Sequence, residues 1–180
     1  MTRLAITSIV LGAVVAAVRI PGIVAPAQYR ACAQKFPRSV LWGRILMAIC
    51  AVWAGIVMYH AATDDWSWIR PLVIIGVPIA YWLVILYAGQ FLAIRAAAAL
   101  LLLIAKAVLD AADLSDAPSR FVVTGLAYLW VCAAIWMAIA PHQVRDWIAI
   151  VTANNTRCRV VCSMGVGIGL TLVALGLLVY

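Results

Sequence analysis

Residues 71–109 read PLVIIGVPIAYWLVILYAGQFLAIRAAAALLLLIAKAVL, an almost unbroken apolar run. Its strongly polar positions are Gln90, Arg95 and Lys106. A single helix of this length would extend about 58 Å at 1.5 Å per residue, nearly twice the ~30 Å thickness of the hydrocarbon core of a bilayer. The run therefore predicts two membrane-spanning helices, Pro71 to Tyr87 and about Phe91 to Leu109, joined by a turn at residues 88–90.

The composition of the whole chain agrees with a membrane protein. The 180 residues are 68% hydrophobic and 11% charged, and the mean hydropathy is +1.12. An ordinary soluble domain has about 45–50% apolar and about 25% charged residues, so this chain has too little polar surface to cover a globule in water. A soluble enzyme, a secreted disulfide scaffold and a disordered tail are excluded, and a polytopic membrane protein remains.

Four further apolar runs complete the predicted architecture. They are Leu4–Val18, Val40–Tyr59, Phe121–Ala140 and Val160–Tyr180. Since about 20 apolar residues cross a bilayer as a helix, we expect an all-α fold of six transmembrane helices in a single transmembrane domain, residues 1–180.

Charge is distributed unevenly among the predicted loops. Thirteen Lys and Arg residues stand against six Asp, there is no Glu, and the formal net charge is +7. The basic residues concentrate in the first and fifth loops, and acidic residues in the second and fourth. Because cytoplasmic loops carry the excess of Lys and Arg, both termini should lie on the non-cytoplasmic side of the cell inner membrane. No basic run is typical of nucleic-acid binding, so nucleic acid is not an expected partner.

The sequence indicates an internal repeat, the alternative being a coincidental match between apolar segments. The hexapeptide APAQYR at 25–30 aligns with APHQVR at 140–145 at an offset of 115 residues, and without a gap Arg44 then aligns with Arg159. The copies cover about 4–60 and 121–180 and flank a central pair of helices at 71–110. Both copies place a basic loop on the same side, so the repeat is parallel, unlike the inverted repeats of many transporters.

Each copy carries a short amphipathic segment after its proline. Pro26 and Pro141 suit the first turn of a helix, where a missing N–H costs nothing. We expect residues 27–36 and 142–151 to form surface helices on the cytoplasmic side, with apolar side chains such as Tyr29 facing the acyl boundary.

The hairpin unit of span, Pro-initiated Arg-bearing helix and Gly-rich span resembles a family of very small, uncharacterised bacterial inner-membrane proteins. The resemblance is clearest over Met137 to Tyr180 and weaker over Gly22 to Tyr59. The family has no established activity, so the resemblance implies a membrane hairpin and no chemistry.

Residues for catalysis are sparse. The sequence has no HExxH, GxSxG or phosphate-loop motif and no Glu, so we expect no catalytic residues and no metal site. His60 and His142 are predicted on opposite membrane faces and do not jointly hold a haem iron, although each alone is a candidate ligand for a pigment or haem. Cys158 and Cys162, four residues apart on one helix face, are interpreted as reduced packing residues.

Two sets of residues are candidates for contact. Small residues spaced by four allow close helix packing, and these are Gly165 with Gly169 and Ala51 with Gly55. Basic residues of the two copies should form a cytoplasmic belt against anionic lipid headgroups or an acidic partner face, the alternative being that they only set topology. The belt comprises Arg30, Lys35, Arg38, Arg44, Arg145, Arg157 and Arg159.

These features favour a non-catalytic integral membrane protein, a structural or accessory subunit that packs against other membrane protein subunits. A second hypothesis is a small transporter, channel or membrane solute-binding protein, with its path in the central pair around Gln90. A third is a pigment- or haem-bearing redox subunit that uses His60 or His142. No cofactor is required by the sequence.

Overall fold

The computed structural model describes residues 3–61, 68–87, 91–113 and 120–178. Regular structure within these ranges is entirely helical, which confirms the predicted all-α class. The elements in chain order are α1 (Arg3–Val24), α2 (Pro26–Lys35), the 3-10 helix η1 (Phe36–Arg38), α3 (Val40–Ala61), α4 (Ile69–Tyr87), α5 (Leu92–Asp113), α6 (Arg120–Ile139), α7 (Pro141–Val151) and α8 (Asn155–Leu178).

The first helix is longer than predicted. We expected it to end near residues 19–22, but α1 continues through Pro21 to Val24. A proline removes only its own N–H, and the carbonyl of Pro21 still accepts a hydrogen bond from the N–H of Ala25 at 2.9 Å. The helix therefore passes through the proline and ends only where the next helix begins.

Two other helices extend by about a turn into segments predicted as loops. α5 runs to Asp113, and on its last turns Lys106 and Asp110 form the i, i+4 ion pair that their spacing predicts. α8 begins at Asn155 rather than near Val160. The predicted turn at residues 88–90 and most of the loop at 61–70 lie outside the described residues.

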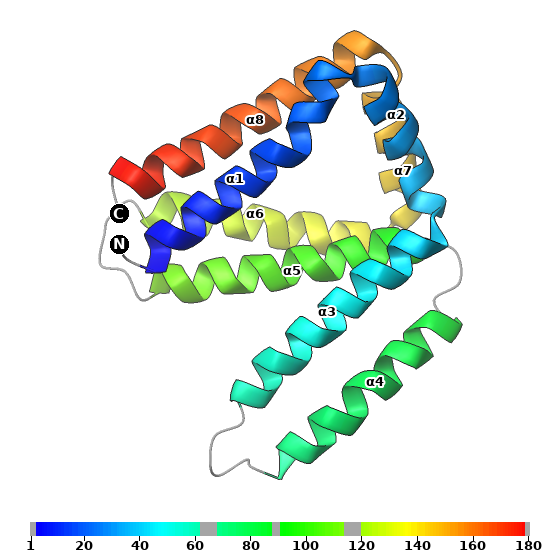
Figure 1. The fold of residues 1–180 in the computed structure, drawn as a ribbon, viewed down its shortest axis with the longest axis vertical. Helices are drawn as coiled ribbons and strands as arrows, with labels where there is room; N and C mark the ends of the chain where they lie inside the picture. The colour runs from blue at the N-terminus through cyan, green and yellow to red at the C-terminus, as the bar shows by residue number, and fades with distance from the viewer. Residues whose placement is uncertain (1–2, 62–67, 88–90, 114–119, 179–180) are drawn as a thin grey trace.

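Helices α1 and α8, far apart in sequence, lie side by side in opposite directions (Figure 1). Their backbones touch at two glycines: a Cβ on Gly169 would lie 2.7 Å from the carbonyl oxygen of Gly12 and 2.9 Å from the N of Ala16. One turn away, a Cβ on Gly165 would lie 3.0 Å from Cγ of Arg19. The Gly165–Gly169 face of α8 is therefore used inside this chain, to bring the first and last helices together.

The centre of the structure is α5, which packs against α3 on one side and α6 on the other. Its contact face is rich in alanine, so neighbouring helices approach closely: a Cβ on Gly43 of α3 would lie 2.9 Å from the N of Ala93. A core cluster lies near the C-terminal end of α5. It comprises Val108, Ala111 and Ala112 of α5, Val123 and Ala127 of α6, and the partly buried Leu11 of α1.

The predicted central pair, residues 71–110, separates in space. Whereas α5 is central, α4 packs on α3 at the edge of the molecule (Figure 1). The physical reason is side-chain size, since α5 offers alanines and α4 offers large side chains such as Leu72, Ile75 and Trp82, each more than 60% exposed. The α3–α4 hairpin thus projects from the rest of the helices.

Five of the helices are long and apolar enough to cross a membrane, and α6 with α7 makes a further candidate that is bent by 111°. This suggests a membrane-spanning protein. The N-terminal end of α1, the C-terminal ends of α5 and α8 and the start of α6 lie toward one end, and α2 and α7 lie at the other (Figure 1).

Candidate functional site at the arginine-rich end

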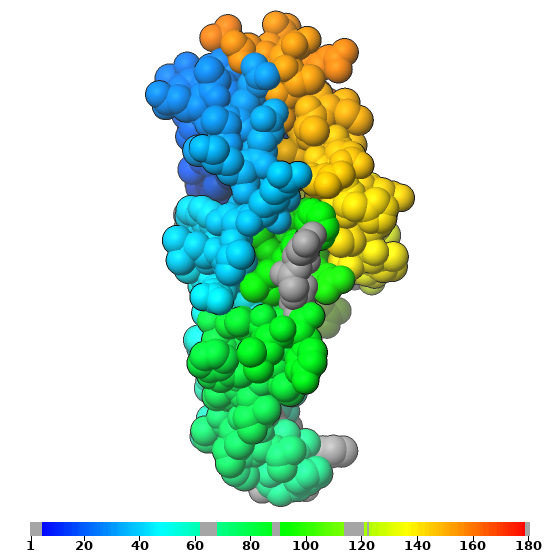
Figure 2. All heavy atoms as spheres, turned by 90° about the vertical axis from the view of Figure 1, so that its right-hand side faces the viewer, coloured from blue at the N-terminus to red at the C-terminus, as the bar shows by residue number. Residues whose placement is uncertain are grey.

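The segments predicted as the two repeat copies, about 4–60 and 121–180, meet where α2 and α7 lie side by side (Figure 2, blue and yellow to orange). Each helix begins with its proline in the first turn, as predicted. All seven residues of the predicted basic belt lie at this end, on α2, η1, α7 and the first turns of α3 and α8. Charges that are spread over two loops in the sequence are therefore brought together.

The corners that precede the two short helices have the same backbone geometry. Ala25 has φ −129° and ψ 67°, and its counterpart Ala140 has φ −125° and ψ 63°. Each alanine N–H donates to the carbonyl four residues earlier at 2.9 Å, and each alanine carbonyl accepts from the N–H four residues later. One alanine thus closes one helix and opens the next, which turns the chain sharply.

A side-chain hydrogen bond holds the second corner. The indole N–H of Trp136 on α6 donates to Oε1 of Gln143 on α7 at 3.0 Å. The glutamine of the repeated hexapeptide therefore connects the two helices that the corner separates.

Arg30 joins the first repeat copy to the second. Its Nε donates to the carbonyl oxygen of Thr152 at 2.5 Å, Nη2 to the carbonyl oxygen of Ala153 at 2.5 Å, and Nη1 to Oδ1 of Asn155 at 2.7 Å. Nε2 of Gln34 adds a bond to Oγ1 of Thr152 at 3.1 Å. The planar guanidinium thereby caps the turn between α7 and α8, where carbonyls have no helical partner.

The other basic residues of the belt are placed differently. Arg145, the counterpart of Arg30, is half-buried and pairs with its neighbour Asp146 through Nη2 at 2.7 Å. The remaining five are exposed at this end, and they are Lys35, Arg38, Arg44, Arg157 and Arg159. Arg30 is thus the member whose side chain is engaged in joining the two copies, and the other six present their charge at the surface.

Tyr29 faces the protein and not the acyl boundary, contrary to our expectation. A Cβ on Gly22 of α1 would lie 3.2 Å from Cδ1 of Tyr29 and would collide with Sγ of Cys162. Burial raises the pKa of Tyr29, the nearby Arg19 guanidinium opposes this rise, and the Cys162 and Cys158 thiols add to it. The phenol is therefore neutral at pH 7, and it packs in the angle between α1, α2 and α8.

The two cysteines predicted to share a helix face do so. Cys158 is 1% and Cys162 is 2% exposed, and both thiols are free. Their burial against α1 and α2 agrees with a packing role.

The two histidines lie on different elements and do not meet. His60 is in the last turn of α3, where it stacks edge-on with Tyr59 at 5.8 Å, and the Arg70 guanidinium lies 5.6 Å from the Tyr59 ring. His142 is exposed in the first turn of α7. Within the described ranges, no three His, Cys, Asp or Glu side chains gather as metal ligands.

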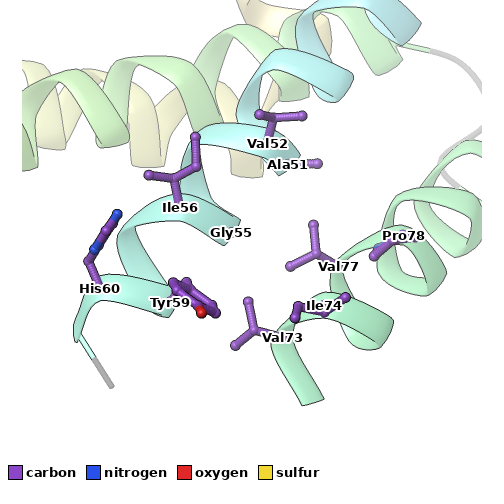
Figure 3. Close-up of a pocket in the computed structure, with 10 residues that line it drawn as sticks. All are labelled: Ala51, Val52, Gly55, Ile56, Tyr59, His60, Val73, Ile74, Val77 and Pro78. Atoms are coloured by element: carbon purple, nitrogen blue, oxygen red, sulfur yellow. The ribbon is translucent and has the colours of Figure 1, made fainter. Parts of the chain in front are cut away.

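The small-residue face of α3 lines a groove toward α4. This groove has a volume of about 310 Å³, and its walls are mostly apolar. Ala51 and Gly55 form one wall, and Val73 and Val77 of α4 face them (Figure 3). A Cβ on Gly55 would lie 3.5 Å from the nearest Val77 atom, which is ordinary contact. The two helices therefore do not press together there as α1 and α8 do.

Sequence reasoning missed several residues of this end. Thr152, Asn155 and Gln34 act only as partners of an arginine more than 100 positions away or of each other, so no local pattern indicates them. Phe91, the residue directly before α5, has φ 70°, a backbone region unusual for an aromatic residue. The repeated arginine was the one available signal.

No protein-family model, curated protein or solved structure matches this chain. Its arrangement provides guanidinium groups, exposed aromatic rings and small-residue faces. In proteins generally, guanidinium groups bind anions and small-residue faces pack helices.

Proposed function

We propose that the chain is a non-catalytic accessory component of the cell inner membrane, with six spans, that packs against other membrane protein subunits. The single observation that carries the accessory role is the open groove beside Ala51 and Gly55. In lipid, helices associate through close packing at small residues, and the chain's own α4 faces this small-residue face only across the groove, without the close backbone approach seen between α1 and α8.

The six-span topology counts α6 as a span and α7 as a surface helix. The 20 residues of α6 extend about 30 Å at 1.5 Å per residue, which is enough to cross the hydrocarbon core. A bend of 111° at the corner turns α7 away from that direction. With the basic belt in the cytoplasm, both termini lie on the non-cytoplasmic side, and the two hairpins form a parallel repeat that arose by duplication.

The native cysteines test this topology. Cys32 lies exposed on α2, whereas Cys50, Cys158 and Cys162 are buried. Cys132 is also exposed, but it lies within α6, a proposed span, where the bilayer would shield it from an impermeant reagent. An impermeant maleimide should label the protein in inverted membrane vesicles and not in intact spheroplasts, and a Cys32→Ser variant should abolish the labelling. Labelling of Cys32 from the outside, or reporter fusions at either terminus that show a cytoplasmic location, would overturn the topology.

The accessory role is tested by filling the groove. Gly55→Leu adds a side chain to the groove, and we expect it to remove proteins that copurify in mild detergent. Gly125→Leu is the matched control, because no heavy atom lies within 4 Å of a Cβ at that position on α6. The proposal fails if wild-type protein is recovered only as a monomer or self-oligomer.

The same preparation distinguishes the other two classes. Ion flux in liposomes containing the purified monomer or self-oligomer would favour a small transporter or channel. A visible absorbance band that disappears in His60→Ala or His142→Ala would favour a pigment- or haem-binding subunit. For the accessory role, we expect neither signal.

A further inference from the structure

A second pocket lies at the arginine-rich end, where η1, α3, α5 and α7 meet. Its volume is about 590 Å³, within the range of small-molecule sites. Its polar walls come from Arg38, Ser39 and Arg145, and its apolar walls include Val40, Phe91 and Leu92.

This pocket occupies the position that corresponds to the Arg30 contact in the other repeat copy. At the offset of 115 residues, Arg145 corresponds to Arg30, and residues 37, 38 and 40 correspond to 152, 153 and 155. Arg30 donates to acceptors at all three of those positions. Arg145 lines a cavity beside the corresponding turn, and the structure gives it no hydrogen bond to residues of that turn.

Sequence differences remove the side-chain partners of the second contact. Asn155, an acceptor for Arg30, is replaced by Val40 at the corresponding position, and Gln34, which braces Thr152, corresponds to Ala149. Ala153 corresponds to Arg38, which adds a second positive charge. The second contact therefore lacks the side-chain acceptor of the first, and a second arginine lines the same pocket.

The pocket carries an excess of positive charge, which favours binding of an anion. Arg145 is partly neutralised by Asp146, through Nε at 2.9 Å and Nη2 at 2.7 Å. Arg38 makes no hydrogen bond or ion pair among the residues that the structure describes. Oγ of Ser39 accepts the N–H of Trp42 at 3.3 Å, and its hydroxyl hydrogen can donate to a ligand. Two guanidiniums and a hydroxyl are the groups that proteins use to hold a phosphate.

We propose that this pocket binds a phosphate-bearing anion between Arg38 and Arg145. The apolar walls beside the two arginines suit the acyl chains of an anionic phospholipid, and a free phosphate offers the same oxygens. The site rests on the proposed position of α2 and α7 at the membrane interface, and it is one defined pocket within the wider basic belt.

The test is a titration of delipidated, detergent-solubilised protein by native mass spectrometry. One probe is phosphatidylglycerol and the other is inorganic phosphate, with zwitterionic phosphatidylcholine as the reference lipid. We expect Arg38→Gln and Arg145→Gln each to weaken anion binding by about tenfold, the usual effect of losing a hydrogen bond to a charged group. Arg157→Gln, which removes an exposed charge at the same end, should change it by less than about twofold.

Two further variants separate binding from folding. Arg145→Lys keeps the charge and should retain most of the binding. Lys106→Met removes an exposed charge on α5 outside the pocket and should leave the binding unchanged. If Arg145→Gln does not fold, Arg38→Gln decides, since Arg38 is exposed at the end of η1.

The two probes identify the source of the phosphate. Millimolar phosphate that displaces the lipid and depends on the same arginines indicates a site for the free ion, and failure to displace it indicates a lipid site. The proposal is overturned if Arg38→Gln and Arg145→Gln bind both probes like the wild type, or if Arg157→Gln loses as much. This readout needs neither a partner nor a membrane orientation, so its failure is distinguishable from failure of the accessory role or the topology.

Discussion

Replacement of Arg30 by glutamine removes the contact that joins the two repeat copies. The guanidinium makes three hydrogen bonds, and the carbonyl of Thr152, a residue 3% exposed, is the buried acceptor. A charged hydrogen bond to a buried acceptor contributes about 1.5 kcal/mol or more. The two exposed bonds contribute about 0.5 kcal/mol each after solvent screening, so the variant should lose about 2.5 kcal/mol of unfolding free energy.

Thermal unfolding in detergent measures this loss. At about 2–4 °C per kcal/mol for a chain of this size, the Tm of Arg30→Gln should fall by about 5–10 °C at a fixed scan rate. Arg145→Gln is the matched control, because Arg145 pairs only with the exposed Asp146 in the described structure, and it should lose less than about 1 kcal/mol. Equal losses in the two variants, or an unchanged Tm for Arg30→Gln, would refute the reasoning.

Three further outcomes follow from the packing. Gly169→Ala places a Cβ 2.7 Å from the carbonyl oxygen of Gly12 and should lower the unfolding free energy by about 1–3 kcal/mol in the same assay. The control is Gly167→Ala, whose Cβ points into open space; it should leave the unfolding free energy unchanged or raise it by up to about 1 kcal/mol. The folded-state pKa of Tyr29 is raised, so its contribution to stability is present below the ordinary phenol pKa of about 10 and is lost as pH rises through the folded-state pKa. Tyr29→Phe should therefore reduce the loss of unfolding free energy at alkaline pH. A pH profile of unfolding identical to that of the wild type would contradict this prediction. Lys106→Met removes an exposed i, i+4 pair and should change the unfolding free energy by less than about 0.5 kcal/mol, so a larger change would show that the pair is structural.

Helix positions were largely predictable because the signals that set them are local. Hydrophobic runs of span length, prolines at the first turns of α2 and α7, and the Lys106–Asp110 spacing all appear in the structure. The errors lie at helix ends. α1 winds through Pro21, because a proline costs one hydrogen bond and the residues after it still find partners.

The candidate site was predictable only in part. The shared hexapeptide and the clustered arginines indicated an important end of the molecule, but they did not distinguish Arg30 from Arg145. That difference depends on Asn155 and Val40, residues that face each arginine from the opposite repeat copy.

The sequence by itself determined the class of protein, the six long helices, the two short ones and the separation of charge, since composition, periodicity and local geometry act within a few residues. Only the tertiary structure decided that α5 is central and α4 peripheral and that Gly12 meets Gly169. It also decided that Arg30 bonds to the turn between α7 and α8, whereas Arg145 lines a pocket. The physical reason is that helix packing depends on the size of facing side chains. Which faces meet is decided between residues far apart in the chain, 50 positions for Gly43 and Ala93 and 157 for Gly12 and Gly169, and no local pattern carries that information.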